Sequence, residues 1–389
     1  TLRDASQFCA TEVKYDIDFN KVIARREGVV SQLRDGVAML LKKAKVNVVD
    51  GMAKFKDSNI IEVDGQEYDA PHIIIATGSH SRTLPVPGAD SEWVLDSTGI
   101  LNLEFVPAEL VVVGGGVIGM EFASVFAALG SKVTVIEYMK QILPPFDSDI
   151  AKRLKQSLSK RGIEIITGAA VTRLEQNYEY KIDVTYTLKG EEHHKLCDNV
   201  LMAVGRGANV EGLGLENAGV AYSAKGIPVD DNMQTNVPGI YAVGDVNGRM
   251  MLAHAATAQG RRALNHILGE SDNINFGIVP SAVFTIPECG MAGLTEEQCK
   301  ERGLAIETGK SFYRANGKAL AMGEADGYCK LIFAKESGLL IGAHIMGADA
   351  ALLAQQCADL MSLGATRQRM RDIIFGHPTL SEIILVAAN

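Results

Sequence analysis

Residues 16–45 carry apolar side chains at intervals of three and four positions, with charged residues between them. This spacing places the apolar side chains on one face of an α-helix. The pattern predicts an amphipathic helix whose apolar face packs against another part of the protein. The apolar positions are Val22, Val29, Val30, Leu33, Val37, Leu40 and Leu41.

Two other hydrophobic patterns predict strands. Short alternating runs between residues 46 and 69 are typical of antiparallel strands with one solvated face. Uninterrupted apolar runs are typical of strands buried in a parallel sheet. Because these runs alternate with helical segments, the sequence predicts an α/β fold. The uninterrupted runs lie at 73–75, 110–113, 201–204 and 240–243, and residues 132–136 form a further strand in which Val133, Val135 and Ile136 are apolar.

Two regions depart from this alternation. Residues 171–174, 181–188 and 195–196 have the pattern of an antiparallel insertion of strands. From Gly277 to the end, short strands surround helices, as in a separate α+β domain. We therefore predict three parts, which are residues 1–105 with 215–276, residues 106–214, and residues 277–389.

The stretch 110–137 combines a buried strand, a glycine-rich turn, a helical segment, a second strand and an acid. In a dinucleotide-binding unit, Gly114 permits the tight turn, Gly116 admits the pyrophosphate and Gly119 lets the helix pack close to the strand. Glu137 lies 18 residues after Gly119, where a carboxylate accepts hydrogen bonds from ribose hydroxyls and repels the 2′-phosphate of NADP. The stretch predicts NAD binding, against the alternative of a glycine turn that only joins a strand to a helix.

Composition and charge narrow the classes of function. The net charge of −9 and the isoelectric point near 5.5 argue against nucleic acid or an anionic membrane as a partner. No apolar run of about 18 residues is present to span a membrane. The six cysteines include neither a C-x-x-C pair nor metal-ligand spacing. We therefore expect a soluble protein without a metal site, in the reducing cytoplasm or, in a eukaryote, the mitochondrial matrix.

The sequence HPTLSE places His377 five residues before Glu382. Pro378 suits the first position of a helix, which would leave His377 just outside that helix. From there its ring can bend back to Glu382, and a carboxylate bonded to one imidazole nitrogen raises the basicity of the other. The pattern is compatible with a general acid–base pair or with an ordinary histidine before a proline-started helix.

Six motifs together resemble the pyridine nucleotide–disulfide oxidoreductase family, most of all its dihydrolipoamide dehydrogenases. In chain order they are IIIATGS, GGGVIGME, AVGR, GIYAVGD, MLAHAA and HPTLSE. The resemblance extends from about residue 16 onward. It implies two nucleotide-binding Rossmann-like domains, the first of them incomplete, followed by an α+β dimerisation domain.

The resemblance also implies the cofactors FAD and NAD and the residues that contact them. His377 would be the acid–base catalyst, oriented by Glu382, acting on the redox disulfide of the other subunit of a homodimer. The substrate would be dihydrolipoamide carried on an acyltransferase or on a glycine-cleavage carrier protein. The FAD contacts would be Thr77, Gly78, Ser79, Asp245, Met251, Leu252, Ala253 and His254. The NAD contacts would be Gly114, Gly115, Gly116, Val117, Ile118, Gly119, Met120, Glu121, Glu137, Val171 and Gly205.

The sequence departs from the family pattern in its first part. The family has a first glycine fingerprint for the FAD pyrophosphate and, a few tens of residues later, a C-x-x-x-x-C redox pair. Neither occurs here, and Cys9 has no cysteine four or five positions away. We therefore expect the chain as printed to hold FAD poorly and to be unable to complete disulfide chemistry.

Two other functions are compatible with these residues. One is a non-catalytic remnant that binds NAD and forms a dimer. The other is a sister enzyme such as a soluble transhydrogenase, which needs no disulfide. A glutathione or trypanothione reductase would carry basic residues in place of Glu137 to prefer NADP, and a mercuric reductase would end in a cysteine pair rather than in VAAN.

Overall fold

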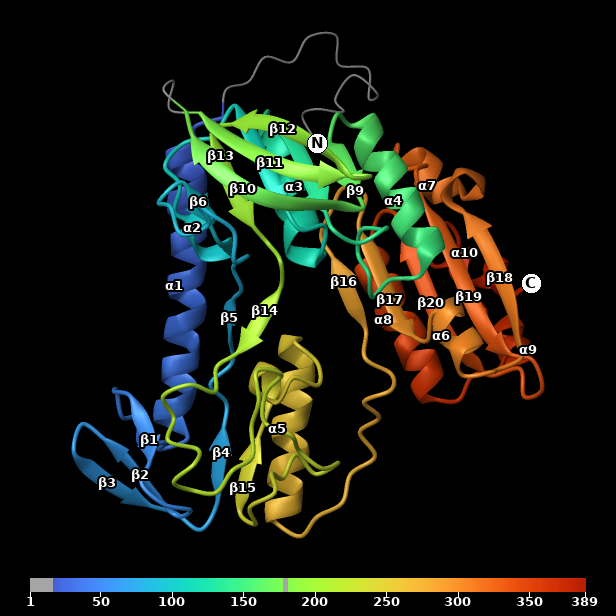
Figure 1. Ribbon diagram of the computed structural model, residues 1–389. Helices are drawn as coiled ribbons and strands as arrows, with labels where there is room; N and C mark the ends of the chain where they lie inside the picture. Colours follow the sequence, from blue (N-terminus) through green and yellow to red (C-terminus); the bar gives the residue numbers. More distant parts are fainter. Residues whose placement is uncertain (1–16, 178–180) are drawn as a thin grey trace. The chain divides into compact units, whose positions relative to one another are not determined.

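The computed structural model describes residues 17–177 and 181–389. The chain divides into two compact units (Figure 1). Unit 1 consists mainly of residues 83–204 and 277–389, and unit 2 of residues 20–82 and 205–276. Each unit is thus built from segments that lie far apart in the sequence. The division into three parts predicted from the sequence stays a prediction.

A five-stranded parallel sheet forms one half of unit 1, in the order β6-β13-β7-β8-β9. Because all pairings are parallel, the carboxyl ends of the strands meet at one edge. The chain adds β8 and β9 on one side of β7, and β13 returns to its other side. In open α/β sheets such a change of direction marks the ligand site. The strands are β6 (Val94–Leu95), β7 (Glu109–Val113), β8 (Lys132–Glu137), β9 (Glu164–Thr167) and β13 (Asn199–Met202).

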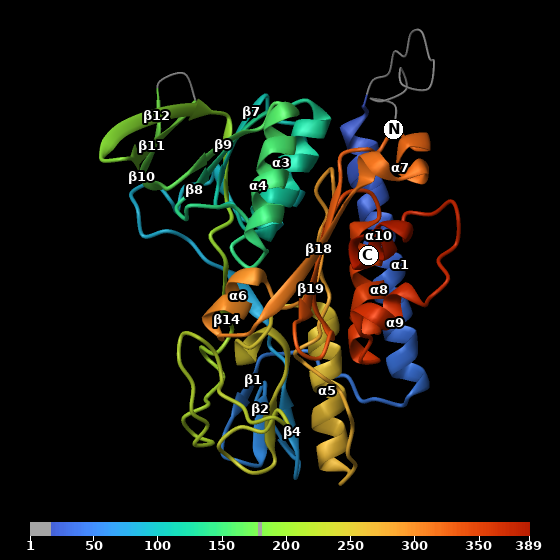
Figure 2. The same ribbon diagram turned by 90° about the vertical axis from the view of Figure 1, so that its right-hand side faces the viewer.

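Helices α3 (Val117–Leu129) and α4 (Ser148–Lys160) lie beside this sheet (Figure 2). They bury Met120 and Leu154 against Leu110, Val112 and Val135 of the strands. Glycine ends α3, since Gly130 takes the left-handed conformation that terminates many helices. A shorter helix, α2 (Ser97–Leu101), precedes β7.

The predicted antiparallel insertion is confirmed. It comprises β10 (Ala169–Gln176), β11 (Ile182–Leu188) and β12 (Glu191–Cys197), which pair in that order. Its apolar face, including Leu174 and Val184, packs on Val111 and Val113 of β7. The insertion therefore covers one side of the parallel sheet.

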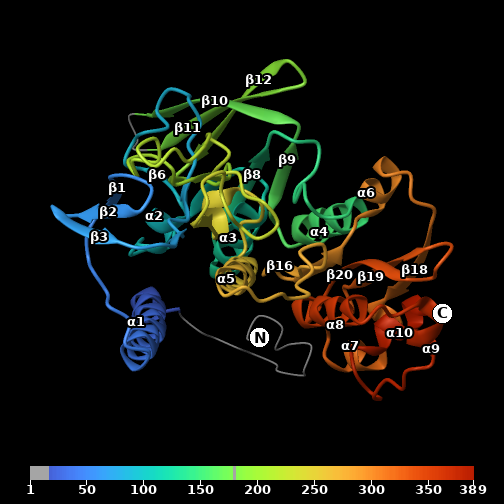
Figure 3. The ribbon, with the colours of Figure 1, turned by 90° about the horizontal axis from the view of Figure 1, so that it is seen from below.

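The C-terminal half of unit 1 is an antiparallel sheet in the order β16-β17-β20-β19-β18. Figure 3 shows α8 and α10 on one face of this sheet and α4 on the other. The predicted α+β region after Gly277 is confirmed. Its strands are β16 (Ser281–Val283), β17 (Cys289–Gly293), β18 (Ile306–Phe312), β19 (Tyr328–Ala334) and β20 (Leu340–Met346). Its helices are α6 (Glu296–Glu301), η3 (Tyr313–Ala315), α7 (Gly317–Ala321), α8 (Ala350–Ser362), α9 (Arg367–Arg371) and α10 (Glu382–Ala388).

Unit 2 combines small sheets with two α-helices and a short 3-10 helix. The predicted antiparallel strands between residues 46 and 69 are present. The apolar run at 73–75 pairs in parallel with the run near 240, but its central residue Ile74 is exposed. Ile73, Ile75, Ile240 and Ala242 belong to its core. The elements are α1 (Phe19–Lys43), β1 (Ala53–Phe55), β2 (Ile60–Val63), β3 (Gln66–Asp69), β4 (Ile73–Ile75), β5 (Ser79–Ser81), β14 (Arg206–Ala208), β15 (Ile240–Ala242), η2 (Gly244–Asn247) and α5 (Ala253–Ile267).

Helix α1 forms as its periodicity predicts, but none of its residues is buried. Leu33 and Leu40 are 67% and 68% exposed. The expected packing of its apolar face is therefore wrong for the part of the chain that the structure describes. The reason is that a helical period is a local property, whereas a covered face needs a surface supplied by another segment.

Within residues 17–177 and 181–389, no helix combines the length and the apolar character that a transmembrane span requires.

Candidate functional site

The three glycines of the fingerprint have different surroundings. Gly114 follows β7 with φ +109°, and a Cβ there would lie 2.3 Å from the carbonyl oxygen of Ala203. A Cβ on Gly119 would lie 2.0 Å from the carbonyl oxygen of Gly114, so α3 packs directly on the turn. A Cβ on Gly116 would meet no atom within 4 Å. The turn is therefore tight at its start, closely packed at its end, and open where a pyrophosphate would approach.

Helix α3 begins immediately after Gly116, which has no side chain to cap it. The first N–H groups of a helix have no partner within that helix, and the helix dipole makes this end favourable for anions. Val117 is exposed and Ile118 half-buried at this end, whereas the side chain of Met120 is fully buried in the core. The side chain of Met120 is therefore not available to a nucleotide, and its N–H donates within the helix to the carbonyl of Gly116 at 3.0 Å.

Glu137 faces the glycine turn from the end of β8. Its Oε2 accepts a hydrogen bond from the N–H of Gly115, and its Oε1 accepts one from the N–H of Met139 at 2.5 Å. The carboxylate is largely buried, with 7% of the residue exposed. Its carboxylate therefore lies between the glycine turn and the chain that follows β8. From there it could accept hydrogen bonds from ribose hydroxyls.

A hollow of about 440 Å³ lies along the loop that follows Glu137. It is formed by the loop of residues 138–146, which connects β8 to α4. The loop that lines this hollow is joined to the glycine turn, because the N–H of Leu143 donates to the carbonyl of Gly115 at 2.8 Å and the N–H of Met139 donates to Glu137 at 2.5 Å. The residues therefore fit NAD. The lining residues are Tyr138, Met139, Lys140, Gln141 and Pro144.

The other predicted NAD residues lie in three environments. Glu121 is half-buried on α3, and burial raises its pKa although its Oε1 accepts a hydrogen bond from the N–H of Phe284 at 2.8 Å. Val171 is buried on β10 in the cluster that contains Val113. Gly205 has φ +105° and belongs to unit 2, where its carbonyl accepts a hydrogen bond from Arg82 at 3.0 Å.

In unit 2, a polar cluster joins Ser79 and Asp245, both predicted to contact FAD. The hydroxyl of Ser79 donates to Oδ2 of Asp245 at 2.5 Å. Arg206 donates from Nε to the same hydroxyl at 2.6 Å and from Nη2 to the carbonyl oxygen of Ser79 at 2.7 Å. This chain of bonds fixes the orientation of the Asp245 carboxylate, which a ribityl hydroxyl of FAD could then meet.

Asn209 holds the turn before Ser79. Thr77 donates its hydroxyl proton to the carbonyl of Asn209 at 2.8 Å, and the Asn209 amide donates back to the carbonyl of Thr77 at 2.9 Å. The N–H of Asn209 also donates to the carbonyl of Gly78 at 3.0 Å. The backbone of Thr77, Gly78 and Ser79 is thereby fixed by the segment that carries Arg206.

The segment of residues 251–254 forms the beginning of α5. Leu252 is the N-cap residue, and no side chain caps this helix end. Met251, Ala253 and His254 are exposed. Farther along α5, Gln259 accepts hydrogen bonds from the N–H of Gly244 at 2.7 Å and from Asn247 at 2.8 Å, and so fixes the turn that carries Asp245. The exposed helix end fits an electron-rich ring edge such as that of a flavin.

The structure brings His377 and Glu382 together, as the sequence predicts. Nδ1 of His377 lies 3.0 Å from Oε1 of Glu382. The expected helix start at Pro378 is wrong, because α10 begins at Glu382. The intervening turn instead bends so that the N–H of Thr379 donates to Oε2 of Glu382 at 2.9 Å, and the His377–Pro378 bond is cis.

Glu382 is held as an anion. Its pKa lies below the ordinary value because the N–H of Thr379 and, next in importance, the His377 ring stabilise the carboxylate. The His377 side chain is 78% exposed, whereas that of Glu382 is 26% exposed. The carboxylate can thus fix one ring nitrogen while the other nitrogen is open to a substrate.

The five cysteines of the described residues are all free and buried. Burial raises the pKa of Cys197 and of Cys329 to about 12. Thiols with such values are not nucleophiles at neutral pH. Cys9 lies outside the described residues.

Three residues of these networks are absent from the sequence-based set, namely Arg206, Asn209 and Gln259. Arg206 stands next to Gly205 in the motif AVGR, so its position was visible, but its partner Ser79 lies 127 residues away. Lys330, which forms a buried ion pair with Asp147 at 2.9 Å, is also absent from that set. It interrupts the apolar strand YCKLIFA, and a lysine in such a strand was the available signal of a buried ion pair.

Two family models cover most of the chain. The model of pyridine nucleotide-disulphide oxidoreductases matches residues 6–260, and that of their dimerisation domain matches residues 279–388. The chain belongs to this family. It is an oxidoreductase of the flavoprotein disulfide reductase type, in the branch that resembles dihydrolipoyl dehydrogenases and uses FAD and NAD. The dimerisation domain indicates a homodimer.

Named relatives agree with this assignment. Dihydrolipoyl dehydrogenase of Bacillus subtilis is 39% identical over 372 residues, which are 95% of this chain and 81% of the relative. LpdA from Mycobacterium tuberculosis has a similar structure, with a TM-score of 0.90 and 29% identity over 100% of this chain and 85% of its own. The HOCl-induced flavoprotein disulfide reductase RclA from Escherichia coli also has a similar structure, with a TM-score of 0.87. It is 32% identical, and the match covers 98% of this chain and 86% of RclA.

Proposed function

We propose that this protein acts as a dihydrolipoyl dehydrogenase, moving electrons from dihydrolipoamide through a disulfide and FAD to NAD. The observation that carries the proposal is the bond between His377 and Glu382 at 3.0 Å. An exposed imidazole bonded to a carboxylate suits proton exchange with a thiol. Binding NAD alone requires no acid–base pair of this kind. The glycine turn and Glu137 support the NAD end of the same electron path.

When bound, FAD and NAD supply the hydride chemistry, and the residues of this chain hold and orient them. Asp245 would bind a ribityl hydroxyl, since Ser79 and Arg206 fix its carboxylate. Glu137 would bind the ribose hydroxyls of NAD, and its charge would repel the 2′-phosphate of NADP. We propose residues 106–214 as the NAD-binding part, residues 277–389 as the interface part, and the remainder as the FAD part.

His377 would exchange the proton. Its Nδ1 is bonded to Glu382, which leaves Nε2 to hold a proton or release it. Glu382 is itself fixed by the N–H of Thr379, so the ring keeps one orientation. In the homodimer, Nε2 would accept the thiol proton of dihydrolipoamide at the disulfide of the other subunit. The substrate would arrive on an acyltransferase or on a glycine-cleavage carrier protein.

The redox disulfide is not among the printed cysteines. No two of the six are separated by four residues, as C-x-x-x-x-C requires. The thiols that the structure describes are buried and protonated. We therefore also propose that these 389 residues do not complete the thiol–disulfide step alone.

The buried thiols favour a second candidate, a non-catalytic dimer that binds NAD. They are equally compatible with a soluble transhydrogenase, which transfers hydride between nucleotides without a disulfide. These functions differ from the first in what they do with lipoamide. All three share NAD binding at the glycine turn.

The test is to titrate the protein with NADH and NADPH by fluorescence and then to assay lipoamide reduction by the chain extended at its N-terminus with a relative's FAD glycine fingerprint and redox cysteine pair. We expect NADH to bind more tightly than NADPH, and His377→Gln to lower the lipoamide rate by about 10²–10⁴-fold. NADH binding without lipoamide turnover would support the non-catalytic dimer. Hydride transfer from NADH to NADP without lipoamide turnover would support the transhydrogenase. A protein that binds no NADH contradicts all three.

A further inference from the structure

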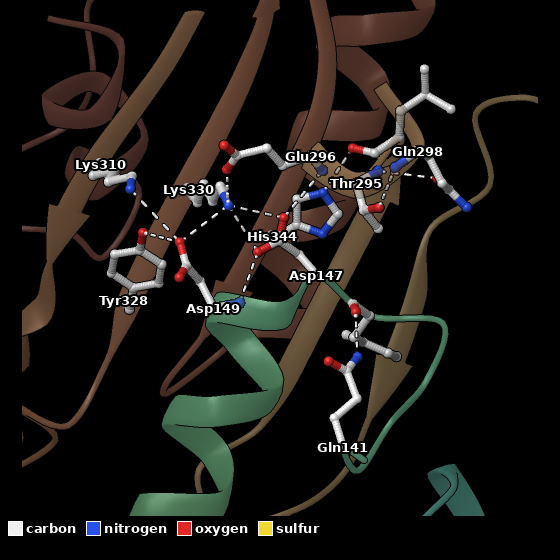
Figure 4. Close-up of polar contacts among 12 residues, drawn as sticks. Gln141, Asp147, Asp149, Thr295, Glu296, Gln298, Lys310, Tyr328, Lys330 and His344 are labelled. Carbon is white, nitrogen blue, oxygen red and sulfur yellow. Dashed lines mark hydrogen bonds and ion pairs between the residues drawn. The ribbon is translucent and has the colours of Figure 1, made fainter. Parts of the chain in front are cut away.

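A buried lysine lies where the C-terminal sheet meets helix α4 (Figure 4). Lys330 stands in β19 between Cys329 and Leu331, which face α8 and α10, so its own side chain points to the opposite face. Its side chain is 1% exposed. Its Nζ lies 2.9 Å from Oδ1 of Asp147, 3.1 Å from Oδ2 of Asp149 and 2.5 Å from Oε2 of Glu296.

Lys330 is charged despite its burial. Burial alone lowers its pKa, but the hydrogen bonds to Glu296 and Asp147 outweigh burial and hold the pKa above the ordinary value. Its cross-strand neighbour His344 adds no charge, because burial lowers the pKa of His344 and its Nε2 donates to the carbonyl of Leu294 at 2.9 Å. Lys330 thus supplies the positive charge that lies against Asp147.

Asp147 connects three elements through one fully buried carboxylate. It caps α4 by accepting the N–H of Asp149 at 3.1 Å, and it accepts the N–H of Glu296, the first residue of α6, at 3.2 Å. Both of its oxygens contact Lys330, at 2.9 and 3.0 Å. A buried carboxylate without a counter-charge is strongly unfavourable, so Asp147 keeps this place because Lys330 is there.

Asp147 is also the end of the loop that forms the hollow beside Glu137. The loop of residues 138–146 is tied at its start, where Glu137 accepts the N–H of Met139, and in its middle, where Leu143 donates to the carbonyl of Gly115 at 2.8 Å. Leu143 has φ +48°, a left-handed conformation that a leucine keeps only when its surroundings impose it. The remaining end is held by the side chain of Phe146, which is buried in the core, and by the cluster of Lys330 and Asp147 that follows it.

We propose that Lys330 is a positioning residue for NAD, which acts through Asp147 to fix the loop of residues 138–146 against the glycine turn. This inference rests on the proposed NAD binding. The C-terminal region thereby contributes to nucleotide affinity through a side chain that does not touch the nucleotide. Its loss moves the loop and widens the hollow in which the adenosine half of NAD would lie.

The test compares Lys330→Met with Lys310→Met. Lys310 lies across from Lys330 on β18 but is exposed and reaches Asp149 at 3.7 Å, so this control removes the same charge without freeing Asp147. We expect Lys330→Met to raise the Kd for NADH about tenfold, within the usual range of coupling between separate sites. Lys310→Met should change it less than about twofold. Hydrogen exchange at the N–H of Leu143 should accelerate in the first variant and not in the second.

Two further variants separate positioning from general stability. The double variant Asp147→Asn/Lys330→Met leaves no unpaired buried charge at position 147, and asparagine can still cap α4. Its Kd for NADH should therefore return to within about threefold of that of the unsubstituted protein. Glu296→Gln weakens the cluster at its exposed carboxylate and replaces Lys330→Met in the test if that variant does not fold. Its Kd for NADH and the exchange rate of the Leu143 N–H should both rise.

The outcomes are distinct. If Lys330→Met, or Glu296→Gln in its place, lowers the melting temperature but leaves the Kd and the Leu143 exchange unchanged, the positioning role is overturned and the NAD site stands. If the unsubstituted protein binds no NADH, the proposed function and this inference are both overturned.

Discussion

Two glycines of one fingerprint have opposite surroundings, although the sequence pattern treats them alike. Gly116 opens onto free space, whereas Gly119 lies against the carbonyl of Gly114. The first is required by the ligand and the second by the fold. The sequence spacing predicted both roles correctly, because the turn that separates them is local.

Alanine at the two positions should therefore have opposite effects. Gly119→Ala should lower the free energy of unfolding by about 1–3 kcal/mol, because its methyl group overlaps backbone that cannot move aside. Gly116→Ala should leave stability within about 0.5 kcal/mol and raise the Kd for NADH roughly tenfold, the equivalent of one lost bond to a charged group. Urea denaturation and NADH titration measure the two effects. Equal losses of stability would contradict the assignment.

The acid–base pair gives a pH-dependent prediction. The pKa of Glu382 is lower in the folded protein than its ordinary 4.5, first because of Thr379 and then because of His377. A group with a depressed folded pKa stabilises the protein above its unfolded pKa and loses that contribution as the pH falls through the folded value. Glu382→Gln should therefore melt at a lower temperature than the unsubstituted protein at pH 7. The difference should shrink below pH 4.5; a difference independent of pH would show that Glu382 is not held as an anion.

The sequence predicted the contact between His377 and Glu382 because both lie on one short turn. It did not predict where the helix starts, since Pro378 suits a helix as well as the turn that forms. The contact between Arg206 and Ser79 was not predicted, for a different reason. Its bond to Ser79 depends on which strands pair, and no local pattern encodes that choice.

At the scale of elements, strand pairing assembles the flavin side of the site. β14 pairs with β5 in antiparallel register, so Arg206 lies opposite Ser81 and reaches the neighbouring Ser79. The pairing therefore determines how the Asp245 carboxylate is oriented. This makes Arg206 a positioning residue within unit 2.

Removing Arg206 should weaken FAD binding without unfolding the protein. We expect Arg206→Met to raise the Kd for FAD roughly tenfold, because Ser79 loses charge-assisted hydrogen bonds and no longer holds Asp245. Arg249→Met is the matched control, since Arg249 contacts Asp231 at 3.4 Å on an exposed site. Quenching of flavin fluorescence gives both values. Equal affinities in the two variants would exclude the positioning role.

Helices and strands with a clear hydrophobic periodicity were predicted well. The segments against which they pack were not. The helix over residues 16–45 forms, but its apolar face is exposed. The insertion of strands forms because alternation and turn residues act locally. Lys330 sits in a strand whose other residues are apolar, and its partner Asp147 comes from the connection between β8 and α4. Long-range pairings of this kind are a property of the assembled fold.

At the scale of the whole molecule, the chain crosses between its two units more than once. A sequence pattern shows segments in order but does not show which segments share a core. The division of the nucleotide-binding parts that the family resemblance implies stays a prediction. The glycine turn, Glu137 and the hollow beside it all lie in unit 1.

Ligand binding should therefore stabilise the units unequally. Calorimetry should resolve two transitions, and NADH at 100 times its Kd should stabilise the one that belongs to unit 1 by about 2.7 kcal/mol. Hydrogen exchange assigns each transition to residues 83–204 with 277–389 or to the other segments. NADPH at the same concentration is the control and should shift the transition less. Equal shifts of both transitions would place the nucleotide elsewhere.

The core beneath α4 has a consequence for exchanging parts between relatives. Leu154 and Ile150 of α4 share one apolar cluster with Val283, Tyr328 and Met346 of the C-terminal sheet. A chimaera that takes its last hundred or so residues from a homologue would inherit a foreign complement to this surface. Such a hybrid should also take the matching side chains of α4 from the homologue. Asp147, which caps α4, and Lys330, which pairs with it, must come from the same parent.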